Sequence, residues 1–365
     1  MVDELSSVLP LIVKLISRQD LTIGEAEQLF TTIFLNDTEG YFFTALVVAL
    51  HTKGETADEL MGLINSSAKL GEKIVPNVSA NLLTDLAGTG GSLIKTINIS
   101  TAASLIVAAA GFTVAKFSGY AQTSATGSAD VFNAFGVDVF KLSKQKVEEI
   151  LEKIGICPFF LSALSPKMKN RSIVARKIFV EKGLGIPSPF HLVAFAYSPT
   201  PLKKRIYGCY SEEYLEILAK LFVKMGNERT FIIHGVGGLP EASVIGKTIL
   251  VEQLGKKITK SILNPSDFGL PTYKKEEIES GGKDQNLIDF LRIIYSKSFG
   301  AKRDMVLANA ALSLMVMGDA DNPLDGAKKA VDILNQGLAA RKLEKLVNYV
   351  GDVSLLNAWK AKAGI

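Results

Sequence analysis

The stretch that decides the fold is Asp85-Leu86-Ala87-Gly88-Thr89-Gly90-Gly91-Ser92, followed shortly by Asn98-Ile99-Ser100-Thr101. The first segment predicts a short strand, residues 82–87, that ends in a glycine-rich turn. Glycine lets backbone amides approach an anion closely and adopt positive φ. The second segment predicts a helix that starts at Ser100 and Thr101, with free N–H groups at its positive dipole end. Together they predict a cradle for a diphosphate group.

This loop fits neither of two common nucleotide-binding patterns. A Walker A loop needs Gly-Lys-Ser/Thr after four intervening residues, which the loop at Gly88 lacks. A Rossmann fingerprint needs a third glycine at the sixth position, where Leu93 stands. The site is therefore expected to bind phosphate through a different architecture.

A second loop follows the next predicted strand, residues 112–117. It runs from Lys116 to Asp130 and is rich in Ser, Thr and Gly. Hydroxyl groups beside one lysine suit a ribose 5-phosphate, because they supply several neutral donors and one cation. The alternative is a simple helix entrance near Ala129, capped by Ser128 or Asp130.

The organisation of the chain changes after Pro76. Before it, apolar residues recur at helical spacing, and Thr22–Glu25 and Thr56–Glu59 each form a capping box that opens a helix. After it, strands and helices alternate, including a helix over Tyr214–Met225 and a strand over Arg229–His234. A mostly helical tail closes the chain.

We therefore predict an α/β protein. It has a small all-helical N-terminal domain and a large α/β domain, whose central, mostly parallel sheet is flanked by helices. The helical domain is expected over residues 1–74, joined by a returning segment near 167–190 that includes a basic helix. The α/β domain is expected over residues 75–166 and 191–365.

Composition excludes several classes of protein. The 365 residues suffice for about two domains. With 47% apolar residues, the chain can bury a sizeable core. The longest apolar stretch, Ala102 to Ala115, is shorter than a bilayer needs, and the N-terminus is acidic, so we expect no membrane segment and a cytoplasmic protein. The two cysteines, Cys157 and Cys209, form no CxxC pair, which argues against a zinc site or a disulfide framework.

At its two loops the sequence resembles the anthranilate phosphoribosyltransferase family, whose motifs run D-x-x-G-T-G-G-D, N-[IVF]-S-T and K-H-G-N-x-x-x-S-S-x-x-G-S-A-D. The resemblance covers roughly residues 5–350. It continues at Lys53-Gly54-Glu55-Thr56, Pro166, Met168-Lys169, Asp267-Phe268-Gly269-Leu270, Gly281-Gly282, Asn286, Arg303-Asp304 and Asn309-Ala310-Ala311. Several independent motifs in the same order make the expected fold specific.

The resemblance implies a reaction and its ligands. Phosphoribosyl pyrophosphate (PRPP), bound with Mg²⁺, loses diphosphate and transfers its phosphoribosyl group to an aromatic amine, with anthranilate as the named acceptor. Positioning and charge stabilisation are expected to dominate catalysis. The resemblance also implies a homodimer formed through the helical domain.

The resemblance assigns site residues as follows. The diphosphate side is expected at Gly88, Thr89, Gly90, Gly91, Asn98, Ser100 and Thr101. The remaining phosphate and ribose oxygens are expected at Lys116, Ser124 and Ser128. The metal is expected at Ser100 and Glu241, and a small aromatic acceptor at Gly119, Pro187 and His191.

Several positions depart from the family's motifs. An aspartate is replaced by Ser92, a histidine by Phe117, an asparagine by Gly119, an arginine that meets the anthranilate carboxylate by Pro187, an aspartate by Pro240, and the histidine of a further motif by Ser165. The losses gather on the acceptor and metal sides. They favour either a transferase with a different acceptor or a catalytically lapsed paralogue that binds something else.

Two other classes stay open. Ser118-Gly119 loosely echoes a loop of pyrimidine nucleoside phosphorylases, which have a related fold. Basic clusters such as Lys203-Lys204-Arg205 are compatible with nucleic-acid binding, but no aromatic residues are interleaved with them for base stacking, so this class is not favoured.

Overall fold

A computed structural model describes residues 4–92, 94–119, 126–160, 164, 167, 174, 192–193 and 195–365. The N-terminal part is a helical bundle. It consists of the short 3₁₀ turn η1 (Ser6–Val8) and the helices α1 (Leu9–Ile16), α2 (Ile23–Asn36), α3 (Tyr41–Lys53) and α4 (Ala57–Leu70). Both predicted capping boxes are confirmed. The Glu25 N–H donates to Thr22 Oγ1 and the Glu59 N–H to Thr56 Oγ1, each at 3.3 Å.

The α/β domain contains two sheets that meet at a single residue. Strands β1 (Leu83–Thr84), β3 (Thr113–Phe117) and β4 (Ile156–Phe159) form one sheet in the order β1-β3-β4. Strand β2 (Leu86–Gly88) starts the second sheet. The prediction of one strand over residues 82–87 is therefore wrong, because the chain changes partner at Asp85: β1 pairs with β3, and β2 pairs with β5.

The second sheet has the order β2-β5-β6-β7-β8. Its later strands are β5 (Lys204–Gly208), β6 (Arg229–Gly235), β7 (Thr248–Leu254) and β8 (Lys257–Leu263). The pairings β1–β3, β3–β4, β2–β5 and β5–β6 are parallel, whereas β6–β7 and β7–β8 are antiparallel. The sheet region is thus mostly parallel, as predicted, and it ends in an antiparallel hairpin that the sequence analysis did not foresee.

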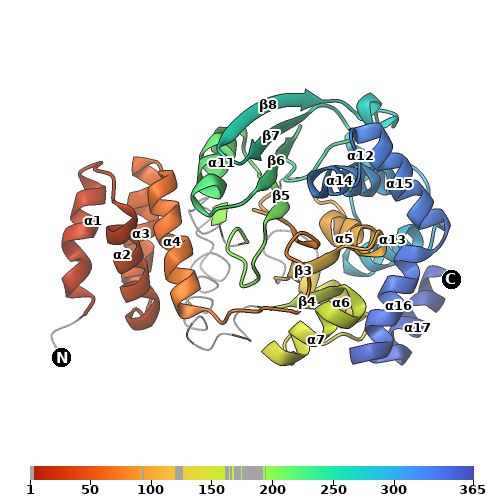
Figure 1. Ribbon diagram of the computed structural model, residues 1–365, viewed down its shortest axis with the longest axis horizontal. Helices are drawn as coiled ribbons and strands as arrows, with labels where there is room; N and C mark the ends of the chain where they lie inside the picture. Colours follow the sequence, from red (N-terminus) through yellow and green to blue (C-terminus); the bar gives the residue numbers. More distant parts are fainter. Residues whose placement is uncertain are drawn as a thin grey trace.

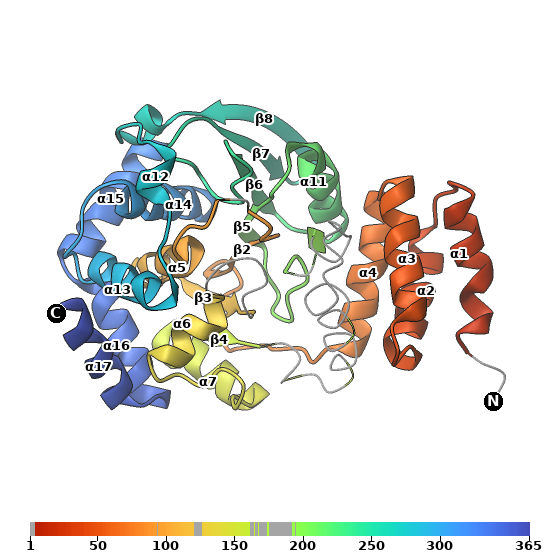
Figure 2. The same ribbon diagram turned by 180° about the vertical axis from the view of Figure 1, so that it is seen from behind.

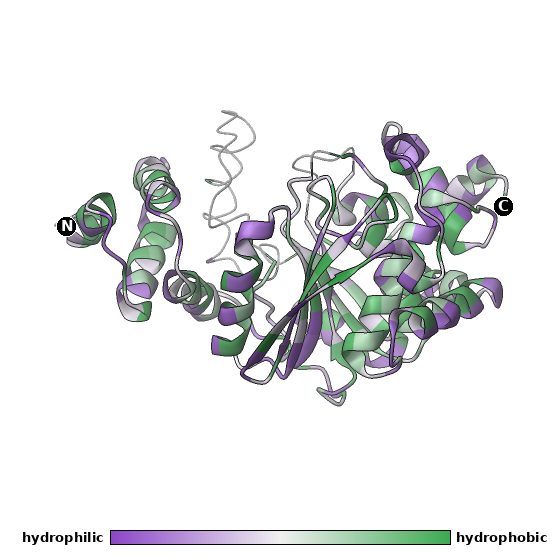
Figure 3. Cartoon of the chain, turned by 90° about the horizontal axis from the view of Figure 1, so that it is seen from above, coloured by the Kyte–Doolittle hydropathy of each residue, from purple (hydrophilic) through white to green (hydrophobic). Residues whose placement is uncertain are grey.

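Helices cover the sheets, and Figures 1 and 2 show the bundle α1–α4 at one end of the molecule and α15–α17 at the other. The covering helices are α5 (Ile99–Ala109), α6 (Ser128–Ala134), α7 (Lys144–Ile154), α11 (Leu215–Lys224), α12 (Lys275–Ile278), α13 (Lys283–Ile294), α14 (Ala301–Met317), α15 (Pro323–Asn335), α16 (Leu338–Val350) and α17 (Val353–Ala363), with the 3₁₀ turns η4 (Glu212–Tyr214) and η5 (Pro265–Phe268). Figure 3 shows that most helices carry both hydrophobic and hydrophilic residues, as expected for helices that pack on one side. In the described part of the chain, no helix has both the length and the apolar character that crossing a membrane requires.

Two hydrophobic cores stabilise the fold. The larger lies within the α/β domain and is built around α5 and α14, which are buried along most of their length. The smaller is formed by the bundle together with α11 and the residues Leu192, Val193, Ala196 and Tyr197. Phe117, at the end of β3, packs against both cores. The carboxyl end of β3 is therefore placed where the helical bundle meets the α/β domain.

Two local predictions need correction or fall outside the described residues. The N-cap residue of α6 is Gly127 rather than Ser128 or Asp130, but Asp130 is its capping-box partner, because Asp130 Oδ2 accepts from the Gly127 N–H at 2.8 Å. Of the expected basic helix and returning segment near residues 167–190, only Lys167 and Val174 lie within the described residues.

Candidate active site

The glycine loop after β2 is fastened to the end of β5. The Thr89 N–H donates to the Gly208 carbonyl at 2.8 Å, and the Tyr210 N–H donates to Thr89 Oγ1 at 3.0 Å. Gly90 and Gly91 adopt φ of +66° and +79°, a region that favours glycine. The Thr89 hydroxyl is thus used to hold the loop against the end of β5.

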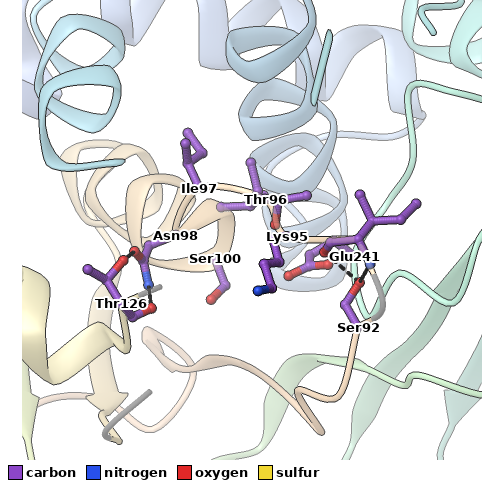
Figure 4. Close-up of a pocket in the computed structure, with 10 residues that line it drawn as sticks. Ser92, Lys95, Thr96, Ile97, Asn98, Ser100, Thr126 and Glu241 are labelled. Carbon is purple, nitrogen blue, oxygen red and sulfur yellow. Dashed lines mark hydrogen bonds between the residues drawn. The ribbon is translucent and has the colours of Figure 1, made fainter. Parts of the chain in front are cut away.

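A pocket of about 110 Å³ opens beside this loop, at the N-terminus of α5. Its lining comes from the loop, the first turn of α5, the second loop and the turn after β6: Ser92, Ile94, Lys95, Thr96, Ile97, Asn98, Ile99, Ser100, Thr126 and Glu241. Figure 4 shows the polar groups of Lys95, Ser100 and Glu241 directed into it. Because it lies beyond the carboxyl ends of parallel strands, it occupies the place where α/β folds commonly bind ligands.

Asn98 joins the two loops. Its Nδ2 donates to the Thr126 carbonyl at 3.0 Å, and the Thr126 hydroxyl donates to Asn98 Oδ1 at 2.7 Å. Figure 4 shows this reciprocal pair at one edge of the pocket. The predicted residue Asn98 therefore lines the pocket, and its amide fixes the second loop against the start of α5.

Lys116 is buried beneath the pocket. Its side chain is 3% exposed, and its Nζ donates to the Leu86 carbonyl and, at 3.3 Å, to Ser100 Oγ. The structure thus groups Lys116 with Ser100 in the first turn of α5. Burial lowers the pKa of Lys116, and the nearby Asp85 carboxylate opposes this effect.

A buried cation supports the base of the loop. Arg205 lies 3.5 Å from Asp85 Oδ2, and both side chains are almost inaccessible to solvent. A second guanidinium contact, at 2.8 Å, goes to the Phe195 carbonyl. Burial raises the pKa of Asp85, while Lys116 and Arg205 oppose the rise. Neither Asp85 nor Arg205 lines the pocket, so we assign them a structural role beneath it.

Glu241 supplies the carboxylate of the pocket. Its Oε2 is enclosed and has no hydrogen-bond partner among the described residues. Burial raises the pKa of Glu241 to about 7, against the opposing charge of Lys116. The turn that carries Glu241 packs closely against the end of β5. A Cβ added at Gly208 would lie only 1.7 Å from the Pro240 carbonyl oxygen.

The pocket is too poor in carboxylates to form a cage for a metal ion by itself. Across the described ranges, no group of three or more His, Cys, Asp or Glu side chains is placed to hold one. Mg²⁺, however, is commonly bound through one or two carboxylates together with substrate phosphates. The unpartnered Glu241 oxygen and the Ser100 hydroxyl fit that arrangement.

Aromatic rings line the other side of the second loop. Phe117 stacks on Phe159, with ring centroids 5.9 Å apart, and tilts against Phe195 at 4.8 Å. A Cβ at Gly119 would lie 2.8 Å from the tip of the Phe195 ring, so a side chain at this position would require the ring to shift. The Gly119 N–H donates to Ser128 Oγ at 3.2 Å.

Of the predicted diphosphate residues, Asn98 and Ser100 line the pocket, whereas Gly88, Thr89, Gly90, Gly91 and Thr101 are not among its lining residues. Gly88, at the end of β2, starts the loop, and Ser100 lines the pocket, but Thr101 is 1% exposed and its hydroxyl points into the protein. Ser124, Pro187 and His191 lie outside the described residues. Sequence reasoning missed Lys95 and Thr126, although a lysine between a glycine loop and a helix start is a readable signal.

Comparison with known proteins agrees with this geometry. Residues 80–340 match the a/b domain of the glycosyl transferase family, and residues 9–70 match its helical bundle domain. An anthranilate phosphoribosyltransferase of Haloarcula marismortui is 33% identical over 328 residues, which are 90% of this chain and 96% of the relative. Another, of Oceanobacillus iheyensis, is 34% identical over 349 residues, 93% of this chain and 97% of the relative.

Solved structures share the fold. The anthranilate phosphoribosyltransferase of Thermus thermophilus superimposes with a TM-score of 0.82 at 26% identity, covering 95% of this chain and 99% of that chain. The Saccharomyces cerevisiae protein, solved in complex with PRPP and Mg, gives a TM-score of 0.83 at 24% identity, covering 94% and 98%. Fold and motifs together define a glycosyl transferase with a helical bundle domain and an a/b domain. The chain belongs to the anthranilate phosphoribosyltransferase family.

Proposed function

We propose that this protein transfers the phosphoribosyl group of PRPP to an aromatic amine, with anthranilate as the first acceptor to test. The observation that carries the proposal is the pocket where the glycine loop, the first turn of α5 and Glu241 converge. Its relatives with this sequence pattern are named for this activity.

The diphosphate of PRPP is expected to lie against the glycine loop. The backbone of Gly90 and Gly91 and the first turn of α5 supply N–H groups and a positive dipole end where negative charge develops on the leaving group. Lys116 contributes from beneath by hydrogen bonding to Ser100. Ser128, together with Ser124 in the predicted assignment, serves the ribose and its 5-phosphate.

Mg²⁺ is the expected metal, held by Glu241, Ser100 and diphosphate oxygens. It supplies charge neutralisation for the departing diphosphate. Ser92 and Pro240 stand where the family's motifs have aspartates, so we expect one protein carboxylate at the metal and a weaker metal affinity than two would give.

The acceptor is expected on the side of Phe117, Phe195 and Gly119, where a flat ring can pack against aromatic side chains. An aromatic amine is already a competent nucleophile, so the site needs no strong general base. Pro187 and His191 remain predicted members of this pocket.

The test is thermal unfolding of the full chain with PRPP, with and without Mg²⁺, followed by assay of diphosphate release with anthranilate. Ligand at about 100 times its Kd should add roughly 2.7 kcal/mol to the unfolding free energy. A Mg²⁺-dependent shift specific to PRPP supports the proposal. No shift at millimolar PRPP contradicts it and favours the lapsed paralogue.

We also propose that the protein forms a homodimer through the helical domain. The outer face of α1 exposes Leu9, Val13 and Ile16, which are 44%, 58% and 68% exposed and recur at helical spacing. Tyr41 on α3 is 75% exposed. Light scattering of Val13→Asp should give a monomer where the wild type gives a dimer, because a charge on this face opposes its burial. A wild type that is monomeric at micromolar concentration contradicts the dimer.

A further inference from the structure

The pocket contains a cation that the motifs do not account for. Lys95 is exposed at the pocket, and no ion pair joins its side chain to another residue in the described part of the chain. Figure 4 shows its ammonium group directed into the same space as the Ser100 hydroxyl and the Glu241 carboxylate. A lysine with a free, solvated ammonium group at a phosphate-sized pocket is available for an anionic ligand.

The main chain holds Lys95 in place from both sides. Its carbonyl accepts from the Ser280 N–H at 2.7 Å, and the flanking Ile94 and Ile97 are buried. On the loop side, Ser92 Oγ donates to the Ile94 carbonyl at 2.9 Å and accepts from the Ile94 N–H at 3.2 Å. The backbone of Lys95 is therefore fixed and only its side chain can move. Its ammonium group thus stays within reach of the pocket.

The balance of charge around the pocket favours an anion before any metal binds. Among the lining residues, Lys95 and Glu241 are the ionisable ones, and beneath them Lys116 and Arg205 stand against the single carboxylate of Asp85. Ser92, at the edge of the glycine loop, contributes a hydroxyl rather than a carboxylate. A pocket lined by several carboxylates would repel diphosphate until a cation neutralised them. This pocket has one carboxylate among its lining residues, Glu241, and therefore accepts diphosphate without that neutralisation.

We propose that Lys95 is a phosphate-binding residue, whose ammonium group contacts the diphosphate directly and lets this pocket hold diphosphate without Mg²⁺. The inference rests on the proposed function in taking diphosphate as the ligand. It adds a direct cationic contact to the backbone amides of the loop. The contact is a charge-assisted hydrogen bond, which is the strongest kind available to a lysine.

The experiment is calorimetric titration of the full chain with inorganic diphosphate in EDTA, at fixed ionic strength. The variants are Lys95→Met, Lys95→Arg and the matched control Lys256→Met, which removes an exposed lysine from the β7–β8 turn. We expect the wild type to bind, Lys95→Met to bind roughly tenfold to a hundredfold more weakly, and Lys256→Met to match the wild type. Lys95→Arg should retain most of the affinity, because it keeps the charge.

Two results would overturn the inference: a wild type that binds no diphosphate in EDTA, or a Lys95→Met variant that binds it as tightly as the wild type. Titration with PRPP and Mg²⁺ in the same series separates this inference from the proposed function. If PRPP is bound and turned over equally by the wild type and Lys95→Met, the function stands and the role of Lys95 fails. If diphosphate binding depends on Lys95 but PRPP is neither bound nor consumed, the role of Lys95 stands and the function fails.

Discussion

Replacing Glu241 by glutamine should make the ligand-free protein more stable and its Mg²⁺-dependent ligand binding weaker. Burial raises the pKa of Glu241 from 4.5 to about 7, which corresponds to about 3 kcal/mol of unfavourable free energy when the carboxylate is ionised. The pKa of Glu241 is higher in the folded protein than in the unfolded chain. The contribution of this group to the free energy of unfolding is therefore fully present below pH 4.5 and is lost as the pH rises to about 7. A glutamine, neutral throughout, should not show this loss.

The assay is urea unfolding of the wild type and Glu241→Gln in EDTA between pH 5 and 8. The free energy of unfolding of the variant should rise relative to that of the wild type as the pH increases to about 7. The difference should reach about 3 kcal/mol at most and then level off. Glu228→Gln, which removes an exposed carboxylate paired with Lys203, serves as control and should change stability by no more than about 1 kcal/mol. Parallel pH profiles for the wild type and Glu241→Gln would refute the assignment of the raised pKa.

The binding arm of the same test uses PRPP with Mg²⁺. Between pH 6 and 8 the ionised fraction of a group with a pKa near 7 rises from about one tenth to about nine tenths, and a metal ligand must be deprotonated. Wild-type affinity should rise over this range. Phosphate groups also titrate near pH 6, so the quantity of interest is the difference between the wild type and Glu241→Gln. An equal affinity of the two proteins at pH 8 would remove Glu241 from the metal site.

Two further substitutions test the support beneath the pocket. Arg205→Met should cost about 3–5 kcal/mol, because it leaves buried Asp85 with only Lys116 as a nearby cation and removes the donor to the Phe195 carbonyl, and adding Asp85→Asn should restore part of the loss; a double variant no more stable than the single one would argue against this pairing. Gly208→Ala should destabilise by about 3 kcal/mol and weaken PRPP binding, because the new methyl group would overlap the turn that carries Glu241. A methyl group at Gly90 would meet open space, so Gly90→Ala should cost only about 1 kcal/mol, because of the positive φ at this position. Chemical unfolding of Gly208→Ala and Gly90→Ala compares the two costs directly.

Features that depend on neighbouring residues could be predicted from the sequence. The capping boxes at Thr22 and Thr56 need only a side chain and an N–H three residues apart. The glycine loop likewise follows from backbone freedom at Gly90 and Gly91. The placement of Ser100 at the start of a helix came from the same kind of local pattern, and the structure differs only in starting α5 at Ile99.

Features that depend on distant partners could not be predicted. Arg205 reads as part of a basic surface cluster, yet it is buried against Asp85, a residue 120 positions earlier. The assignment of Lys116 to phosphate and ribose oxygens stays a prediction, but no local pattern indicates that its side chain is buried with β3 and reaches beneath the pocket to Ser100. The division of the first strand at Asp85 depends on which strands pair, and periodicity carries no information about that.

The Phe195 ring packed over Gly119 couples these two positions over evolutionary time. An asparagine, the residue found here in the family's motif, can enter at position 119 only if the tip of the ring moves aside. The effect of a substitution at either position therefore depends on the residue at the other. Homologous chains with a phenylalanine at the position of Phe195 should retain a glycine opposite it. A residue smaller than phenylalanine at position 195 should make position 119 more tolerant of asparagine.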